Sequence, residues 1–308
     1  MSLIVVGSMA FDAIETPFGK SEKIIGGAAT YIAWSASNFT RPIKQVSVVG
    51  GDFPKNELSM LEARGVNMEG VQIKENEKSF FWSGRYHMDM NSRDTLETQL
   101  NVLGTFRPEL PESYQDCEFL MLGNLAPSVQ ISVIKQLRKK PKLVVLDTMN
   151  FWMETAMGEL ETVLKNVDVL LINDSEARQL SAQYSLVSAA ATIMKMGPKF
   201  LVIKKGEHGA LLFHEDNVFF APALPLEVVF DPTGAGDTFA GGFIGHIART
   251  KDTSFENMKS AIIVGSAMAS FCVEKFGTSR LKELKWEHID NRIRRFKELT
   301  KFEINLEN

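Results

Sequence analysis

Short apolar runs recur along the chain at intervals that leave room for helices. Six of them, rich in Val, Ile and Leu, lie at residues 3–6, 45–50, 118–123, 142–147, 167–173 and 199–204. Runs that are apolar at nearly every position are typical of parallel strands covered on both faces of a sheet. Helical patterns occupy residues 26–39, 128–140 and 175–197. The alternation predicts an α/β fold with a doubly wound, mostly parallel sheet flanked by helices, and it places candidate functional loops at the carboxyl ends of the strands.

Residues 78–103 do not follow this alternation of apolar strands and helices. Polar and apolar positions alternate there, and Gly84 and the sequence MNSRD at 90–94 interrupt them, which predicts antiparallel strands. Such strands would form either a small β-sheet that covers the main sheet as a lid or an extra hairpin of the main sheet. No Pro-, Gly- or Ser-rich linker and no repeat divides the chain. We therefore expect one domain over residues 1–308, with lid elements at 12–24 and 78–103.

The composition is that of an ordinary globular protein, with 44% hydrophobic and 23% charged residues in a chain of 308. The net charge of -4 argues against a nucleic-acid binder. The first residues, MSLIVVGSMAFD, lack the basic segment of a secretion signal and the length of a membrane span. We expect a cytoplasmic enzyme without nucleic-acid or membrane partners. Cys117 and Cys272 have no metal-ligand spacing, and neither have the five histidines, so we expect both thiols to be buried.

The sequence FDPTGAGDTFAGGFIGH at 230–246 places several glycines beside two aspartates. The preceding VVF has the character of a strand end, and TFAGGFIGHIA that of a buried helix, so DPTGAGD would be the turn between them. Glycines in such a turn let backbone N–H groups converge at the start of the helix, where the helix dipole favours an anion. Asp237 falls in the first helical turn. It would either complement the helix dipole or act as a general base on an attacking hydroxyl group.

Two better-known phosphate-binding motifs do not fit this chain. A Walker A loop requires GxxxxGK followed by Ser or Thr, and no such string occurs. The dinucleotide-binding GxGxxG follows an early strand, whereas GAGDTFAG has a different spacing and lies late in the chain.

The sequence DPTGAGDTFAGGF strongly resembles the C-terminal motif of the ribokinase-like (PfkB) carbohydrate kinase family, and IGGAATYIAWSAS at 25–37 resembles its N-terminal di-glycine motif. Intermediate landmarks follow in the family's order: GSMAFD, VVGGDFPKNEL, NDSE and KKGEHGA. The resemblance covers essentially the whole chain. It implies a ribokinase-like fold and ATP-dependent transfer of the γ-phosphate to a hydroxyl, usually the CH2OH group of a sugar or nucleoside.

The resemblance also implies roles for individual residues. Asp237 would be the general base, and the amides of Gly234, Ala235 and Gly236 the anion hole. Residues for substrate binding would be Asp12, Gly26, Gly27, Tyr31, Asn124 and Asp237. Residues for ATP binding would be Asn173, Lys204, Gly206, Gly209, Thr233, Gly234, Gly236 and Gly277. Asn173 and Glu176 would organise Mg2+ indirectly, and Asp231 and Thr233 match positions that bind a monovalent cation such as K+ in some members. Without the resemblance, Asn173 and Glu176 have the pattern of a helix N-cap.

Several positions depart from the family's pattern. Tyr31 stands where many sugar-specific members carry Asn, which makes a plain ribokinase a poorer match. The sequence LDTMNFWM at 146–153 lacks the Arg found in several sugar-kinase branches. Lys204 occupies a position where Thr is common, and its ammonium group would contact phosphate or lie in solvent.

The acceptor is left open between a sugar and a nucleoside. Aromatic side chains that would stack on a nucleobase, or form the buried face of the lid or a dimer contact, are Phe80, Phe81, Trp82, Tyr86, Phe151 and Trp152. Nothing in the sequence fixes the direction of Arg85 and Asp89 on the lid. The alternatives are a vitamin-type kinase acting on pyridoxal or hydroxymethylpyrimidine, and a ligand-binding protein of the same fold without catalysis. A homodimer through the lid is a further expectation.

Overall fold

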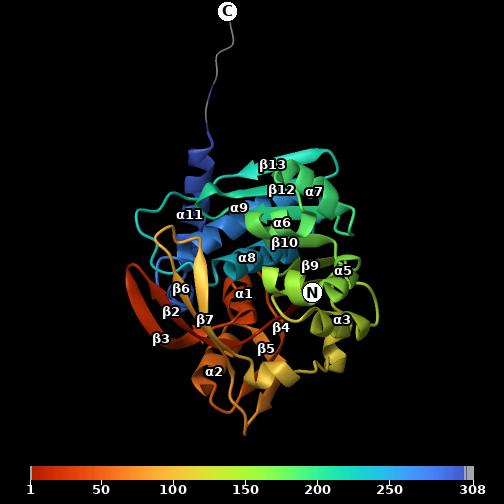
Figure 1. Cartoon of the computed structure of the whole chain (residues 1–308), viewed down its shortest axis with the longest axis vertical. Helices are drawn as coiled ribbons and strands as arrows, with labels where there is room; N and C mark the ends of the chain where they lie inside the picture. The colour runs from red at the N-terminus through yellow and green to blue at the C-terminus, as the bar shows by residue number, and fades with distance from the viewer. Residues whose placement is uncertain (1, 302, 304–308) are drawn as a thin grey trace, which may run out of the picture.

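The computed structural model describes residues 2–301 and 303, so that Met1, Phe302 and residues 304–308 of the expected domain lie outside the described part. Its centre is a nine-stranded sheet, sheet A, in the order β13-β12-β11-β10-β9-β8-β1-β4-β5 (Figure 1). All pairs from β11 to β5 are parallel, and β12 and β13 add an antiparallel edge. The strands are β1 Leu3–Val6, β4 Ile43–Gly50, β5 Val66–Lys74, β8 Phe119–Leu122, β9 Leu143–Asp147, β10 Val169–Asn173, β11 Phe200–Lys204, β12 Ala210–His214 and β13 Asn217–Ala221.

Helices cover both faces of sheet A, because its inner strands are apolar on both sides. In β1, Leu3 and Val5 join one hydrophobic core, whereas Ile4 and Val6 join the other. The first core is shared with α1 Ala28–Ala36, α2 Lys55–Ala63, α8 Ala235–Thr250, α9 Phe255–Cys272, α10 Ser279–Lys282 and α11 Trp286–Leu299. The second is shared with α3 Pro127–Lys135, α4 Asn150–Thr155, α5 Met157–Leu164, α6 Asp174–Ser181 and α7 Leu186–Met194. The predicted doubly wound fold is confirmed.

The six apolar runs all form strands of sheet A, but two details of the prediction are wrong. Residues 175–197 form two helices, α6 and α7, because Ala182 takes a left-handed backbone conformation (φ 53°) after Ser181. Residues 228–230 are not a strand, because the hairpin β12–β13 occupies that edge of sheet A. The amides of Phe230 and Asp231 instead donate to the carbonyl of Val273 after α9.

A second, separate sheet, sheet B, consists of β2 Ala10–Thr16, β3 Gly19–Gly26, β6 Phe80–Tyr86 and β7 Arg93–Gln99 in the order β3-β2-β6-β7. In Figure 1 it stands at the left, in red and orange, beside α1. The strands β6 and β7 are antiparallel, as predicted for residues 78–103, and they are not a hairpin of the main sheet. The short 3-10 helices η1 Asn101–Thr105, η2 Glu112–Tyr114 and η3 Gly206–His208 complete the structure. In the part of the chain that the structure describes, no helix is long and apolar enough to cross a membrane.

Candidate active site

The loop before α8, residues 231–234, is a candidate anion-binding loop. Gly234 has a φ of 73°, and a Cβ at this position would overlap the ring of Tyr31, so that both backbone and packing require glycine. The amide of Ala235 donates to the carbonyl of Pro232 at 3.1 Å. The first amides of an α-helix have no partner within the helix, and here those of Gly236 and Asp237 follow directly. The start of α8 can therefore receive a phosphate group.

Asp231 fixes the shape of this loop. The side chain is fully buried, and its Oδ1 accepts from the amide of Thr233 at 2.8 Å, while Oδ2 accepts from the amide of Gly277 at 2.9 Å. Burial raises the pKa of Asp231, although these backbone amides act against the shift. Gly277 has a φ of 59°, which favours glycine at the contact. The carboxyl group thus ties the anion-binding loop to the segment that follows α9.

Asp237 lies in the first turn of α8, next to these amides. Its pKa is raised to about 7, first by burial and then by the negative charge of Asp147. The positive charges of Lys204 and Arg93 act in the opposite direction. A carboxyl group with a pKa near neutrality can accept a proton from a substrate hydroxyl and release it again.

Lys204 and Asp147 form a largely buried ion pair beside the start of α8. Nζ of Lys204, at the end of β11, lies 3.1 Å from Oδ1 and 3.0 Å from Oδ2 of Asp147, at the end of β9. A Cβ on Gly236 would lie 3.1 Å from the same Nζ, so the ammonium group lies beside the first turn of α8. Burial lowers the pKa of Lys204, but Asp147 and Glu176 outweigh it and the net shift is upward. The lysine is therefore charged beside the first turn of α8.

Asp12 and the two glycines predicted for substrate binding lie together. Asp12 is buried on β2, and a Cβ on Gly26 of the neighbouring strand would overlap its carboxyl group. Gly27 caps α1 with a φ of 92°, and a Cβ there would lie 2.5 Å from the carbonyl oxygen of Ser8. Burial, and then the charges of Asp231 and Asp237, raise the pKa of Asp12 to about 8. The carboxyl groups of Asp12 and Asp237 therefore influence each other.

Tyr31 and Asn124 have different surroundings. Tyr31 is only 1% exposed, its ring supports Gly234, and its hydroxyl has no hydrogen-bond partner among the described residues. Asn124 follows β8, and its Oδ1 accepts from Nε1 of Trp152 at 2.8 Å. Phe151, 48% exposed, packs edge-on against Trp152 at 4.8 Å between ring centroids. Asn124 is therefore held in one orientation beside an exposed aromatic ring.

Asn173 and Glu176 form the helix cap that their spacing suggests. The amide of Asn173 donates to Oε2 of Glu176, and the amide of Glu176 donates to Oδ1 of Asn173, both at 2.8 Å. Burial raises the pKa of Glu176 to about 7, although Lys204 acts against the shift. No group of three potential metal-binding side chains occurs in residues 2–301 and 303. A cation here would depend on phosphate oxygens and water as well as on the protein.

The two spaced glycines after Lys204 form a tight loop. Gly206 and Gly209 have φ angles of 54° and 84°. A Cβ on Gly209 would overlap the carbonyl of Ala221, and one on Gly206 would overlap the side chain of Asn91 in the β6–β7 turn. Sheet B therefore touches the loop predicted to bind the nucleotide.

Sequence reasoning missed two charged residues of the site, Asp147 and Arg93. It considered Arg85 and Asp89 on the same segment, but Arg85 pairs with Glu15 at 3.0 Å, and Asp89 accepts hydrogen bonds from Ser92 within the turn. Arg93 is opposite Tyr86 in the register of β6 and β7. The alternation of β7 could have suggested Arg93 only once this register was known.

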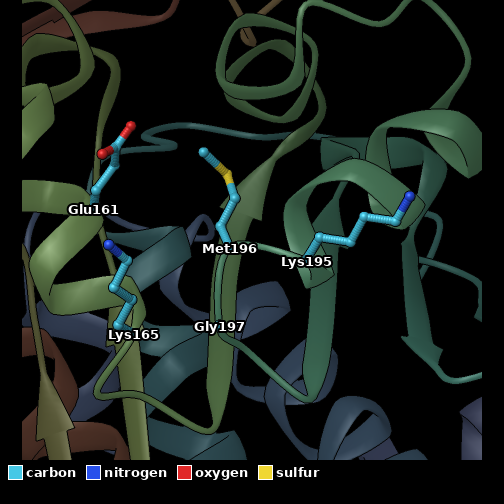
Figure 2. A pocket seen from close by; sticks show the side chains of 5 residues that line it. All are labelled: Glu161, Lys165, Lys195, Met196 and Gly197. Atoms are coloured by element: carbon cyan, nitrogen blue, oxygen red, sulfur yellow. The ribbon is translucent and has the colours of Figure 1, made fainter.

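A shallow hollow lined by Glu161, Lys165, Lys195, Met196 and Gly197 lies elsewhere (Figure 2). Lys165 and Lys195 follow α5 and α7 and precede β10 and β11. The hollow is therefore at the amino ends of these parallel strands, whereas Asn173 and Lys204 are at their carboxyl ends. It is separate from the candidate site.

Comparisons with known proteins identify the family and the fold. The profile of the pfkB family carbohydrate kinases matches residues 2–284. The cytidine kinase of Thermococcus kodakarensis is 28% identical over 283 residues, which cover 90% of this chain and 98% of that protein. A Burkholderia thailandensis nucleoside kinase in complex with inosine has a TM-score of 0.75 at 20% identity, covering 95% of this chain and 98% of that chain.

A second solved structure is an E. coli protein described as a ribokinase II, in complex with ATP and Mg2+. It has a TM-score of 0.78 at 19% identity and covers 96% of this chain and 99% of that one. These structures confirm the ribokinase-like fold. Because the family profile spans nearly the whole sequence, the chain belongs to the pfkB family of carbohydrate kinases and is a phosphotransferase with an alcohol group as acceptor.

Proposed function

We propose that this protein uses MgATP to phosphorylate the hydroxymethyl group of a nucleoside, with Asp237 as general base and the amides of Gly234, Ala235 and Gly236 as anion hole. The observation that carries the proposal is the position of Asp237, half-buried in the first turn of α8 with a pKa of about 7. A carboxylate beside an anion site repels the anion, so we expect one there only where it has another task. Proton removal from the acceptor is such a task.

The choice of a nucleoside over a free sugar rests on two points. The relative named above is a cytidine kinase, and one structural neighbour was solved with inosine. In this chain, Phe151 offers an exposed ring for stacking beside Asn124, whose orientation Trp152 fixes. Asp12 and the backbone at Gly26 and Gly27 would hold the ribose hydroxyls.

In the transfer step, the acceptor oxygen forms a bond to the γ-phosphorus. The bond from that phosphorus to the oxygen bridging the β- and γ-phosphates breaks, and its electron pair stays on ADP. Asp237 takes the hydroxyl proton. The amides at the start of α8 stabilise the negative charge on the phosphoryl oxygens.

Nucleotide binding would involve the opposite side of the same loop. Lys204 lies beside Gly236 and would contact a phosphate oxygen. The remaining ATP contacts would come from Asn173, Gly206, Gly209, Thr233 and Gly277. Asn173 and Glu176 would hold Mg2+ through water, which fits an ion that usually keeps several waters and few carboxylates. Bound Mg2+ supplies positive charge to the phosphates. Asp231 and Thr233 would contribute to a monovalent-cation site.

Sheet B would act as a lid, formed by residues 12–24 and 78–103. The side chain of Tyr86 accepts a hydrogen bond from Thr233 Oγ1 at 3.2 Å, so that sheet B already contacts the anion-binding loop. A lid that closes over the acceptor would exclude water and keep the phosphoryl group from hydrolysis.

The test measures ADP release from MgATP in the wild type and in Asp237→Asn. The acceptors are cytidine, inosine, D-ribose, D-fructose and pyridoxal, each supplied separately. We expect turnover with a nucleoside, a loss of about 100- to 10,000-fold in kcat in the variant, and unchanged binding of ATP. Turnover with pyridoxal alone would favour the vitamin-type kinase. Thermal stabilisation by ligands without ADP release would favour a binding protein.

A further inference from the structure

Arg93 is placed on the inner face of sheet B by the strand register. It is the first residue of β7 and is opposite Tyr86 on β6, so the two side chains share a face. Along β6 the same face carries Trp82, which is opposite Asp12 on β2. Asp12 is the buried substrate-side carboxyl group described above. The register therefore puts Arg93 on the face of sheet B that is turned toward the candidate site.

One contact at this end of sheet B lies within the sheet, and a second joins the sheet to the loop before α8. The guanidinium carbon of Arg93 lies 5.6 Å from the centroid of the Trp82 ring, a cation–π geometry. The ring of Trp82 lies where a Cβ on Gly84 would be, so glycine lets it lie close to the strand. At the end of β6, Tyr86 is hydrogen-bonded to Thr233 in the anion-binding loop.

The turn before Arg93 reaches the nucleotide side. The side chain of Asn91 lies against Gly206, in the loop that follows Lys204. Arg93 thus lies between two contacts to other loops, one from Tyr86 to Thr233 before α8 and one from Asn91 to Gly206 after β11.

The charge of Arg93 acts on three separate elements. Burial is the main cause of the raised pKa values of Asp12 on β2, Asp237 on α8 and Glu176 on α6, and Arg93 acts against the shift in all three. Within residues 2–301 and 303, Arg93 forms no ion pair, whereas Arg85 on the opposite face of sheet B pairs with Glu15. The guanidinium, on a strand that is exposed throughout, is therefore not held by an ion pair and is free to contact a ligand.

We propose that Arg93 is a catalytic residue whose guanidinium contacts the γ-phosphoryl group during transfer, from the side opposite the anion-hole amides. The inference rests on the proposed function. Arg93 forms no covalent bond and gives up no proton in the step. It stabilises the negative charge that the transferring group carries on its oxygens, for which a planar, permanently charged group with several N–H donors is suited.

The test compares Arg93→Ala and Arg93→Lys with Arg85→Ala, a matched change on the same sheet but the other face. With MgATP and cytidine, or inosine if it is the better acceptor, we expect Arg93→Ala to lower kcat about 100- to 1,000-fold, with the KM for ATP changed less than about threefold. Arg93→Lys should recover part of the rate. Arg85→Ala should stay within about twofold of the wild type.

Two further readouts separate catalysis from a structural role. The charged groups that influence Asp237 are Asp147 on β9, Lys204 on β11, Asp12 on β2 and Arg93 on β7. Because the positive charge of Arg93 lowers the pKa of Asp237, its removal should move the acid limb of kcat/KM to higher pH. By calorimetry, Arg93→Ala should bind MgADP normally but lose at least about 100-fold in affinity for MgADP with fluoroaluminate and the acceptor, a mimic of the transferring phosphoryl group.

Equal losses in Arg93→Ala and Arg85→Ala would overturn the inference, as would a change in KM alone or unchanged affinity for the fluoroaluminate complex. In each of these cases the wild type would still be active and Asp237→Asn inactive, and the proposed function would stand. A wild type that binds MgADP but turns over no acceptor would overturn both.

Discussion

The ammonium group of Lys204 lies 3.0 Å from Oδ2 of Asp147, so that a buried ion pair joins the carboxyl ends of β11 and β9 directly beneath the first turn of α8. The two side chains are 17% and 7% exposed. An ion pair this far from solvent cannot lose one partner without leaving the other charge buried.

We therefore expect Lys204→Met to lower the free energy of unfolding by about 3–5 kcal/mol. Adding Asp147→Asn should recover most of this loss, because both charges are then absent. Urea unfolding of the wild type, both single variants and the double variant measures the coupling. Arg294→Met, which breaks the exposed Arg294–Asp290 pair, is the control and should cost less than about 1 kcal/mol. Equal stability of Lys204→Met and the wild type would contradict the prediction.

The raised pKa of Asp237 predicts the pH dependence of the reaction. A general base must be unprotonated, so kcat/KM should be flat above about pH 8 and fall roughly tenfold per pH unit below the pKa of about 7. In Lys204→Met the limb should move to higher pH, because Lys204 lowers the pKa of Asp237. An acid limb near pH 4 in the wild type would show that the pKa of the base is not raised, and the prediction would be wrong.

Asp12 should make the folded protein less stable as the pH rises. Its pKa is about 8 in the fold and 3.8 in the reference state, so the folded chain binds more protons between these values. Its contribution to stability is thus fully present below about pH 4 and is lost as the pH rises through about 8. Asp12→Asn should remove this part of the slope and be more stable than the wild type at pH 8.5.

Urea unfolding at pH 5.0 and pH 8.5 measures the effect. Asp216→Asn, in the exposed turn between β12 and β13, is the control and should not alter the slope. If Asp12→Asn and the wild type lose stability in parallel, Asp12 is ionised in the fold at neutral pH and the prediction is wrong.

Gly234 should tolerate no side chain. Gly234→Ala would place a Cβ in the ring of Tyr31 and force an alanine to a φ of 73°, which costs about 1–2 kcal/mol from the backbone alone. We expect a loss of stability of at least that size and a fall in kcat, because the amides beside Gly234 would move. Gly158→Ala is the matched control, since nothing lies within 4 Å of its Cβ and helix α5 should gain about 0.5–1 kcal/mol. Full activity of Gly234→Ala would rule out the rigid anion hole.

The main sheet could be predicted because its inner strands are covered on both faces and are therefore apolar throughout. The edge strands β5, β12 and β13 were not predicted. Such strands are partly exposed, so apolar residues such as Val218 and Phe220 lie in solvent there and do not mark a buried face. Residues 175–197 were read as one helix because the break at Ala182 depends on a backbone angle and carries no glycine or proline signal.

The glycine-rich loop and Asp237 were readable for the opposite reason. Gly234 is required by its backbone angle and by the contact with Tyr31, and such a requirement can be recognised in the sequence. The sequence carries no comparable signal for Arg93 and Asp147. Their importance comes from the order of the strands, because the pairing of β6 with β7 and the position of β10 between β9 and β11 are properties of the assembled fold.

The hydrogen bond from Gly277 to Asp231 joins residues 46 positions apart, and it gives the order in which the protein can become active during synthesis. When the ribosome has completed α8, the carboxyl group of Asp231 still lacks one of its two backbone donors. The loop before α8 can then take its final shape only after α9 and the segment that follows it have been made. A nascent chain would therefore complete the strands of sheet A, the last of which ends at Ala221, before this loop is fixed.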